Sequence, residues 1–199
     1  MPIVDEQIKT FSFGSENKHL KIENGYLEFD GGKIILDTVT DIKYGVEPIQ
    51  VDMFYIGRRF VIDLKSKENQ VKIILKSYFD YHKTYFYEVF NRILKTIWKE
   101  TTIRLIDESI ETILQGGELA VGKCKISKDG ILYSNHLITW ADLTYQKKYE
   151  MITINCKSNP KIWTNMYFLQ DYNVDVLKHI LDWVYEYEGL QEIEDHRLE

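Results

Sequence analysis

The sequence carries one series of short motifs twice, and an internal repeat restricts the fold of a chain more than any other pattern does. Five segments of the first half match five of the second half in the same order. The matched segments begin at Gly25 and Gly130, Thr38 and Thr139, Phe60 and Ile152, Asp80 and Asp171, and Val89 and Val176. The spacing between partners falls steadily along the chain, as a duplication followed by loop shortening in the second copy would leave it. We therefore expect two similar units.

Each copy has the pattern of several short strands followed by one amphipathic helix. Apolar residues occupy every second position over 60–64 and 152–156, with the same parity in both segments, which is the period of a strand. Later in each copy, apolar residues recur at helical spacing. These are Phe86, Val89, Phe90, Ile93 and Ile97 in the first copy, and Val174, Leu177, Ile180, Leu181 and Val184 in the second. The largest change in spacing lies between Tyr44 and Phe60, so the first copy contains extra chain around Gly45-Val-Glu-Pro48.

A third helical pattern lies between the copies. Apolar residues at helical spacing begin at Ile103 and end before Gly116-Gly117, and glycine is a common stop just past a helix. The pattern predicts four segments. They are unit 1 over residues 1–102, a connecting helix over 103–117, unit 2 over 118–187 and an acidic tail over 188–199.

This arrangement resembles the pleckstrin-homology-like superfold (PH-like below), made twice. The resemblance rests on Gly25 and Gly130, on Asp41-Ile42 and Asp142-Leu143, and on closing helices that contain Trp98 and Trp183. It covers about residues 17–187, and the chain is similar to tandem members of that superfold without an assigned activity. The resemblance implies an α+β fold of two units joined by a short helix, each a small antiparallel β-barrel or sandwich capped by a C-terminal helix. It also implies a non-catalytic role in binding lipid headgroups, peptides or proteins.

The first hairpin of each unit departs from the lipid-binding version of that superfold. Members that bind phosphoinositides place lysines and arginines in and beside this hairpin, where they converge on phosphates. Here the first copy offers Lys21 with Glu23 and no arginine, and the strand after Gly130 has no arginine either. We therefore do not expect a specific phosphoinositide site.

Composition indicates a folded domain protein with an acidic balance. The chain has 199 residues with 44% hydrophobic residues, and its 25 basic against 31 acidic side chains give a net charge of −6. An acidic balance argues against nucleic-acid binding, which needs a basic surface. No stretch approaches the ~18 apolar residues of a membrane-spanning helix, and the N-terminus lacks the pattern of a signal peptide. We therefore expect a soluble, cytoplasmic protein.

Residues capable of catalysis or metal binding do not form a recognisable constellation. Cys124 and Cys156 share strand faces with apolar neighbours, so buried free thiols are favoured over a disulfide. The segment 117–124 matches a phosphate-binding loop except at its last residue, but it follows a helix and enters a strand, which is the wrong context. The histidines show no metal-ligand spacing. We therefore expect no cofactor, no metal and no enzymatic activity.

One basic segment remains as a candidate binding surface. Over residues 58–76, basic side chains outnumber acidic ones, and alternation places Lys72 and Lys76 on one face. Aromatic residues follow from Tyr78 onward, and exposed Tyr beside Arg is typical of protein interfaces. The candidate partner-binding residues are Arg58, Arg59, Lys72, Lys76 and Tyr78. The simplest interpretation is a solvated face whose lysines protect a strand edge. The functional hypothesis for these residues is a docking surface for a protein partner, with an anionic membrane surface as the alternative.

Overall fold

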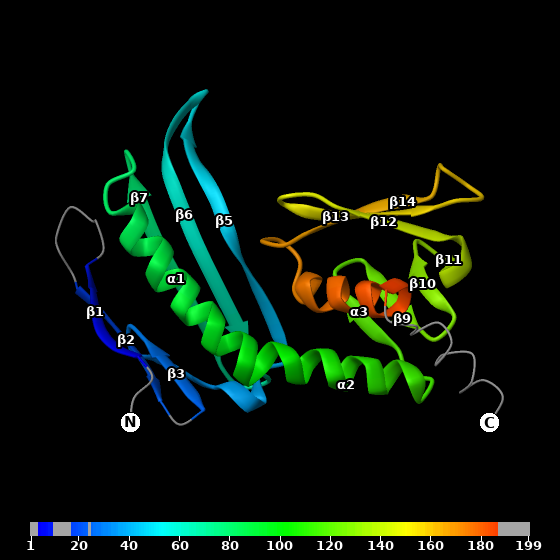
Figure 1. Ribbon diagram of the computed structural model, residues 1–199, viewed down its shortest axis with the longest axis horizontal. Helices are drawn as coiled ribbons and strands as arrows, with labels where there is room; N and C mark the ends of the chain where they lie inside the picture. The colour runs from blue at the N-terminus through cyan, green and yellow to red at the C-terminus, as the bar shows by residue number, and fades with distance from the viewer. Residues whose placement is uncertain (1–3, 10–16, 24, 187–199) are drawn as a thin grey trace. The chain divides into compact units, whose positions relative to one another are not determined.

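The same order of strands and helices occurs twice in the computed structural model, which describes residues 4–9, 17–23 and 25–186. The fold is α+β, with four small antiparallel sheets, a 32-residue central helix and a C-terminal helix (Figure 1). The chain divides into two compact units, residues 1–103 and 104–199. The predicted acidic tail, 188–199, and the turn residue Asn24 lie outside the described residues.

Unit 1 contains a four-stranded and a three-stranded antiparallel sheet, each with its strands in sequence order. The first sheet is formed by β1 (Val4–Lys9), β2 (Asn17–Glu23), β3 (Tyr26–Phe29) and β4 (Gly32–Ile35). The 3-10 turn η1 (Leu36–Thr38) leads to β5 (Asp41–Val51), β6 (Phe54–Lys65) and β7 (Gln70–Tyr78). Helix α1 (Lys83–Ile97) follows the second sheet.

Unit 2 repeats this order. Its first sheet is formed by β8 (Leu119–Val121), β9 (Cys124–Ser127), β10 (Gly130–Tyr133) and β11 (His136–Thr139). The turn η3 (Trp140–Asp142) leads to β12 (Leu143–Lys147), β13 (Met151–Cys156) and β14 (Trp163–Tyr167), and α3 (Val174–Glu186) closes the unit. The prediction of a strand series closed by a helix, made twice, is confirmed.

Of the predicted barrel or sandwich, the closed barrel is wrong. Within the described residues each unit has two separate sheets and no closed barrel. The reason lies at the 3-10 turns η1 and η3, where the chain leaves one ladder and starts another. In unit 1, β4 therefore does not hydrogen-bond to β5, and β1 does not hydrogen-bond to β7 among the strands described.

The predicted short connecting helix is instead the second part of a longer helical segment. Helix α1 continues through a π-helical stretch, η2 (Trp98–Thr102), into α2 (Ile103–Leu114). Nothing in η2 is a glycine or a proline, so the sequence has no signal that would end the helix there. The end comes at the predicted glycines, where the N–H groups of Gly116 and Gly117 donate to Ile113 O and Thr112 O at 3.0 and 2.8 Å.

Strand register supports the alignment of the two copies in their second sheets. Ile42 of β5 pairs with Leu64 of β6, and the matched residues Leu143 and Cys156 pair in the same way in unit 2. Both helices also begin alike, because the residue before each one, His82 or Asn173, has a left-handed backbone with φ of 57° and 60°.

The apolar stripes of the two helices are buried as predicted. All the residues of both predicted stripes lie in the core. In unit 1 this stripe contacts β6 and β7, and Arg92 on α1 also forms an ion pair with Glu6 of β1 at 2.7 Å. Each large apolar side chain buried in this way contributes about 1.5–3 kcal/mol to folding.

The two matched glycines have different structural roles. Gly25 lies in the two-residue turn between β2 and β3 with φ of +76°, where an added Cβ meets nothing within 4 Å. Gly130 is already paired in β10, opposite Thr139, and an added Cβ would lie 2.1 Å from Ile138 O. The sequence match at this point is therefore shifted by one position, and Gly130 is required by the close approach of β11.

We predict that Gly130→Ala lowers the free energy of unfolding by about 2–3 kcal/mol, because the new methyl group overlaps a backbone carbonyl of β11. The matched control Gly25→Ala costs about 1 kcal/mol, which is the left-handed backbone penalty alone. Urea denaturation followed by circular dichroism measures both. Equal effects of the two substitutions would contradict the assignment.

Candidate functional site

Alternation along β6 and β7 places four of the five candidate residues on one side of the sheet. Arg59 lies opposite Lys76, Lys72 opposite Asp63, and Tyr78 opposite Gly57. These four candidates, Arg59, Lys72, Lys76 and Tyr78, form what we call the basic face. The other side of the strands carries Phe60, Ile62 and Leu64, which are buried on the side of α1.

Arg58 belongs to the side of the sheet that faces α1. Its Nε donates a hydrogen bond to the hydroxyl oxygen of Tyr55 at 2.9 Å, and the Tyr55 hydroxyl donates to Asp80 Oδ1 at 3.2 Å. Asp80 also lies 3.7 Å from Lys83 Nζ at the start of α1. These contacts give Arg58 a role in linking β6 to the turn before α1.

Cross-strand carboxylates neutralise part of the basic face. Arg59 Nε donates to Glu47 Oε1 at 2.6 Å, and Glu47 is its direct neighbour on β5. Asp63 is a buried carboxylate that accepts a hydrogen bond from Gln70 Nε2 at 2.8 Å and lies 3.9 Å from Lys43 Nζ. The sequence interpretation missed the contribution of Glu47, because its position beside Arg59 depends on strand pairing.

Lys72 and Lys76 are the cations that the basic face presents to solvent. Both side chains are exposed, and within the described part of the chain neither ammonium group lies in an ion pair. Tyr78 is half-buried at the end of β7. The candidate surface therefore consists mainly of two lysines, with Arg59 already paired.

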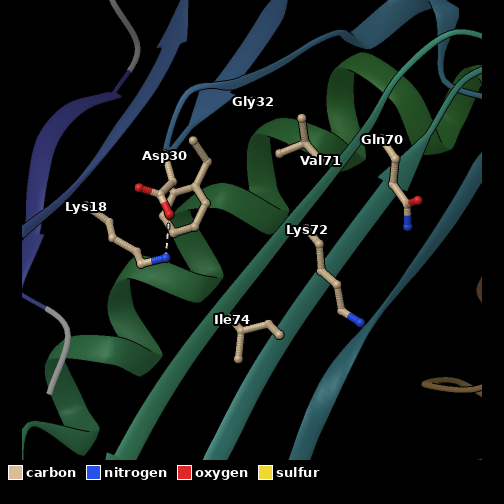
Figure 2. A pocket seen from close by; sticks show the side chains of 8 residues that line it. Lys18, Asp30, Gly32, Gln70, Val71, Lys72 and Ile74 are labelled. Atoms are coloured by element: carbon tan, nitrogen blue, oxygen red, sulfur yellow. Dashed lines mark hydrogen bonds and ion pairs between the residues drawn. The ribbon is translucent and has the colours of Figure 1, made fainter. Parts of the chain in front are cut away.

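A cavity of about 260 Å³ lies beside Lys72, between β7 and the turn that joins β3 to β4. Its lining includes the apolar side chains of Phe29, Val71 and Ile74, together with Lys18, Asp30, Gly32, Gln70 and Lys72. Figure 2 shows Lys18 turned toward Asp30, with which it forms an ion pair, and Lys72 and Ile74 on the neighbouring strand. The cavity thus combines apolar contact area with two ammonium groups.

The chemistry of this lining suits binding better than catalysis. It offers amines, one amide and one carboxylate that Lys18 already neutralises, with no base held against a nucleophile. Within residues 4–9, 17–23 and 25–186, no group of His, Cys, Asp and Glu side chains could hold a metal ion.

Both cysteines are buried free thiols, as predicted. Burial, together with nearby Asp171, raises the pKa of Cys124 from 9.0 to about 11, so this thiol is protonated at neutral pH. Cys156 Sγ donates a hydrogen bond to Asp142 Oδ2 at 2.9 Å. Neither environment is the electropositive, partly exposed setting of a reactive cysteine.

Asp142 fixes the chain just after β13. Besides the thiol of Cys156, it accepts hydrogen bonds from the Ser158 N–H at 2.8 Å and from the Ser158 hydroxyl. These contacts, that of Cys156 first, hold the pKa of the Asp142 carboxyl below its ordinary value of 3.8. The role of Asp142 is therefore to tie β12 to the turn that leads to β14.

An apolar hairpin tip was not among the predicted site residues. Val51, Met53 and Phe54, at the turn between β5 and β6, are exposed. The sequence did offer a signal for this tip. Its apolar residues lie in the extra chain of the first copy, and the second copy builds its core without a corresponding segment.

No protein-family model, curated protein or solved structure matches the chain. None of the helices in the described residues is long and apolar enough to cross a membrane. The interpretation of the site therefore rests on the residues themselves.

We predict that Cys124 in the folded protein reacts with iodoacetamide at pH 8 at least about 100-fold more slowly than a peptide thiol, because a raised pKa and burial both remove the thiolate. Mass spectrometry of the alkylated peptides measures the rate. The same cysteine in urea is the control and reacts at the peptide rate. Rapid labelling of the folded chain would contradict the assignment.

We also predict that Asp142→Asn destabilises the protein at pH 7 and that this effect shrinks as the pH falls below 3.8. A carboxyl whose folded pKa is depressed contributes stability above its ordinary pKa and loses that contribution on protonation. Urea denaturation of wild type and variant between pH 7 and pH 3 measures the difference. A pH-independent gap would refute the role of the charge.

Proposed function

We propose that this chain is a non-catalytic, cytoplasmic binding protein built from two PH-like units, and that its basic face docks an acidic protein partner. The proposal of PH-like units is supported by the order of elements, four strands, three strands and a helix, in both halves. The observation that carries the docking proposal is the position of exposed Lys72 beside a cavity whose lining is mainly polar and includes the half-buried Ile74.

The mixed chemistry of the surface favours a protein as the partner. The half-buried Ile74 suits one apolar side chain of a partner, while the ammonium groups of Lys72 and Lys76 suit carboxylates around it. An acidic segment that also carries an apolar side chain fits both features.

A membrane contact through the same face is the weaker alternative. Binding to anionic lipid typically uses clusters of about 4–8 basic residues. Here Arg59 is paired with Glu47, and Arg58 lies on the other side of the sheet. Two exposed lysines beside a cavity of mixed polar and apolar lining support a protein contact instead.

We predict that the double variant Lys72→Glu, Lys76→Glu weakens binding of the partner at least about tenfold, because both exposed charges of the face are reversed. The full chain is immobilised, partners are captured from native lysate and identified by mass spectrometry, and the affinity of the purified main partner is measured. The lysines are better targets than Arg59, since reversing Arg59 would also break its ion pair with Glu47.

The control variant is Lys95→Glu, Lys99→Glu, which makes the same change in net charge on exposed positions of the helical segment. It should leave the affinity unchanged. Equal weakening by both double variants, or weakening by neither, would remove the basic face as the docking surface.

A further inference from the structure

The hairpin that joins β5 to β6 is longer than folding of the unit requires. The last residue of β7, Tyr78, pairs with Gly57, and the Phe79 N–H donates to Ile56 O at 2.8 Å, so residues 50–55 lie beyond the third strand as a two-stranded ribbon. Figure 1 shows this ribbon extending past the end of β7. The corresponding strands of unit 2, β12 and β13, are short and complete their sheet without such an extension. The ribbon is therefore an addition to unit 1.

The end of this ribbon presents apolar side chains and one acid to solvent. Met53 is 95% exposed, Phe54 75% and Val51 55%. Val51 pairs with Phe54, so Asp52 and Met53 form a two-residue turn, which is a short and well-defined connection. Asp52 is exposed and has φ of 54°. We call residues 51–54 the tip.

The tip and the cavity beside Lys72 have complementary chemistry. The tip offers the side chains of Met53 and Phe54 with the carboxylate of Asp52 next to them. The cavity offers the half-buried side chain of Ile74 within a mainly polar lining, together with the ammonium group of Lys72, while Lys18 is paired with Asp30. Its volume, about 260 Å³, is enough for one large side chain.

The two surfaces cannot meet within one molecule. They belong to the same sheet but to its two ends, since Lys72 lies near the start of β7 and the tip lies beyond its last residue. At the rise of a strand, they are about 30 Å apart along the ladder. The tip of one molecule can therefore fill only the cavity of another.

We propose that the chain associates with a second copy of itself head to tail, with the Phe54 side chain of one copy seated in the cavity of the next and Asp52 facing Lys72. The proposal rests on the proposed function in that it uses the same cavity, and it names the partner. Because the two surfaces differ, the contact is heterologous, and it forms a ring where the rotation between copies closes and an open chain where it does not.

A lipid surface fits the tip less well than a second copy does. The charge of Asp52 lies at the very turn that would enter the bilayer, and burial of an unpaired carboxylate is costly. In the cavity of a second copy, the same carboxylate meets an ammonium group. The acid at the tip thus favours a protein site with a basic rim.

The test uses two single variants of the full chain and their mixture, studied by analytical ultracentrifugation. A tip of this size buries less than a standard interface, so we expect a dissociation constant of about 0.1–1 mM for the wild type. Phe54→Ser and Lys72→Glu each lower the association constant at least about tenfold. Both positions are exposed, and circular dichroism checks that each variant is folded.

The mixture is the decisive measurement. Phe54→Ser keeps an intact cavity and Lys72→Glu keeps an intact tip, so together they form a one-to-one dimer and nothing longer. The control Tyr149→Ser, at a position 77% exposed in unit 2, associates like the wild type.

Three results would overturn the proposal. They are a wild type that stays monomeric up to about 1 mM, a mixture of the variants that forms no dimer, and a monomer that sediments with phosphatidylcholine–phosphatidylglycerol vesicles in a way that depends on Phe54. Failure here is distinct from failure of the proposed function, because Phe54→Ser leaves the basic face and its capture of another partner intact. Conversely, dimerisation of the mixture would support this proposal even if the binding of lysate proteins does not depend on Lys72 and Lys76.

Discussion

Burial of the apolar stripe of α1 against β6 and β7 decides which surface of unit 1 is left for binding. Phe86, Val89 and Ile93 take up one face of these strands, together with Phe60 and its neighbours. Because side chains alternate along a strand, the choice of the inner face also sends Arg59, Lys72 and Lys76 outward together. A shift of one residue in either strand would reverse this arrangement.

Strand pairing then determines which of these cations are exposed to solvent without a carboxylate partner among the described residues. Glu47 lies beside Arg59 only because β5 pairs with β6 in one register, and the same register brings Lys43 near the buried Asp63. The number of basic residues in the segment 58–76 is therefore larger than the number of unpaired positive charges on the basic face. The lysines of the edge strand β7 keep their charges exposed because no further strand of this sheet lies beside them.

Local patterns predicted the elements well, and long-range contacts limited the rest. The buried stripes of α1 and α3 and the order of strands follow from spacing alone. The closed barrel failed because closure depends on hydrogen bonds between distant strands, which no local pattern specifies. The prediction of a separate connecting helix failed for a different reason, since residues 98–102 lack any stop signal and a boundary between copies was assumed there. The cavity could not be predicted, because it brings Lys18 and Phe29 beside Lys72.

The repeat makes unit 2 an internal comparison for unit 1. What both units share is what one core needs: two small sheets and a helix with a buried stripe. What only unit 1 has, the extended β5–β6 ribbon, is not needed for that core, and its exposed Met53 and Phe54 carry a cost in solubility. Exposed apolar side chains gathered at one place are typical of interaction surfaces, and the acid among them favours a site that supplies a cation over a purely apolar one.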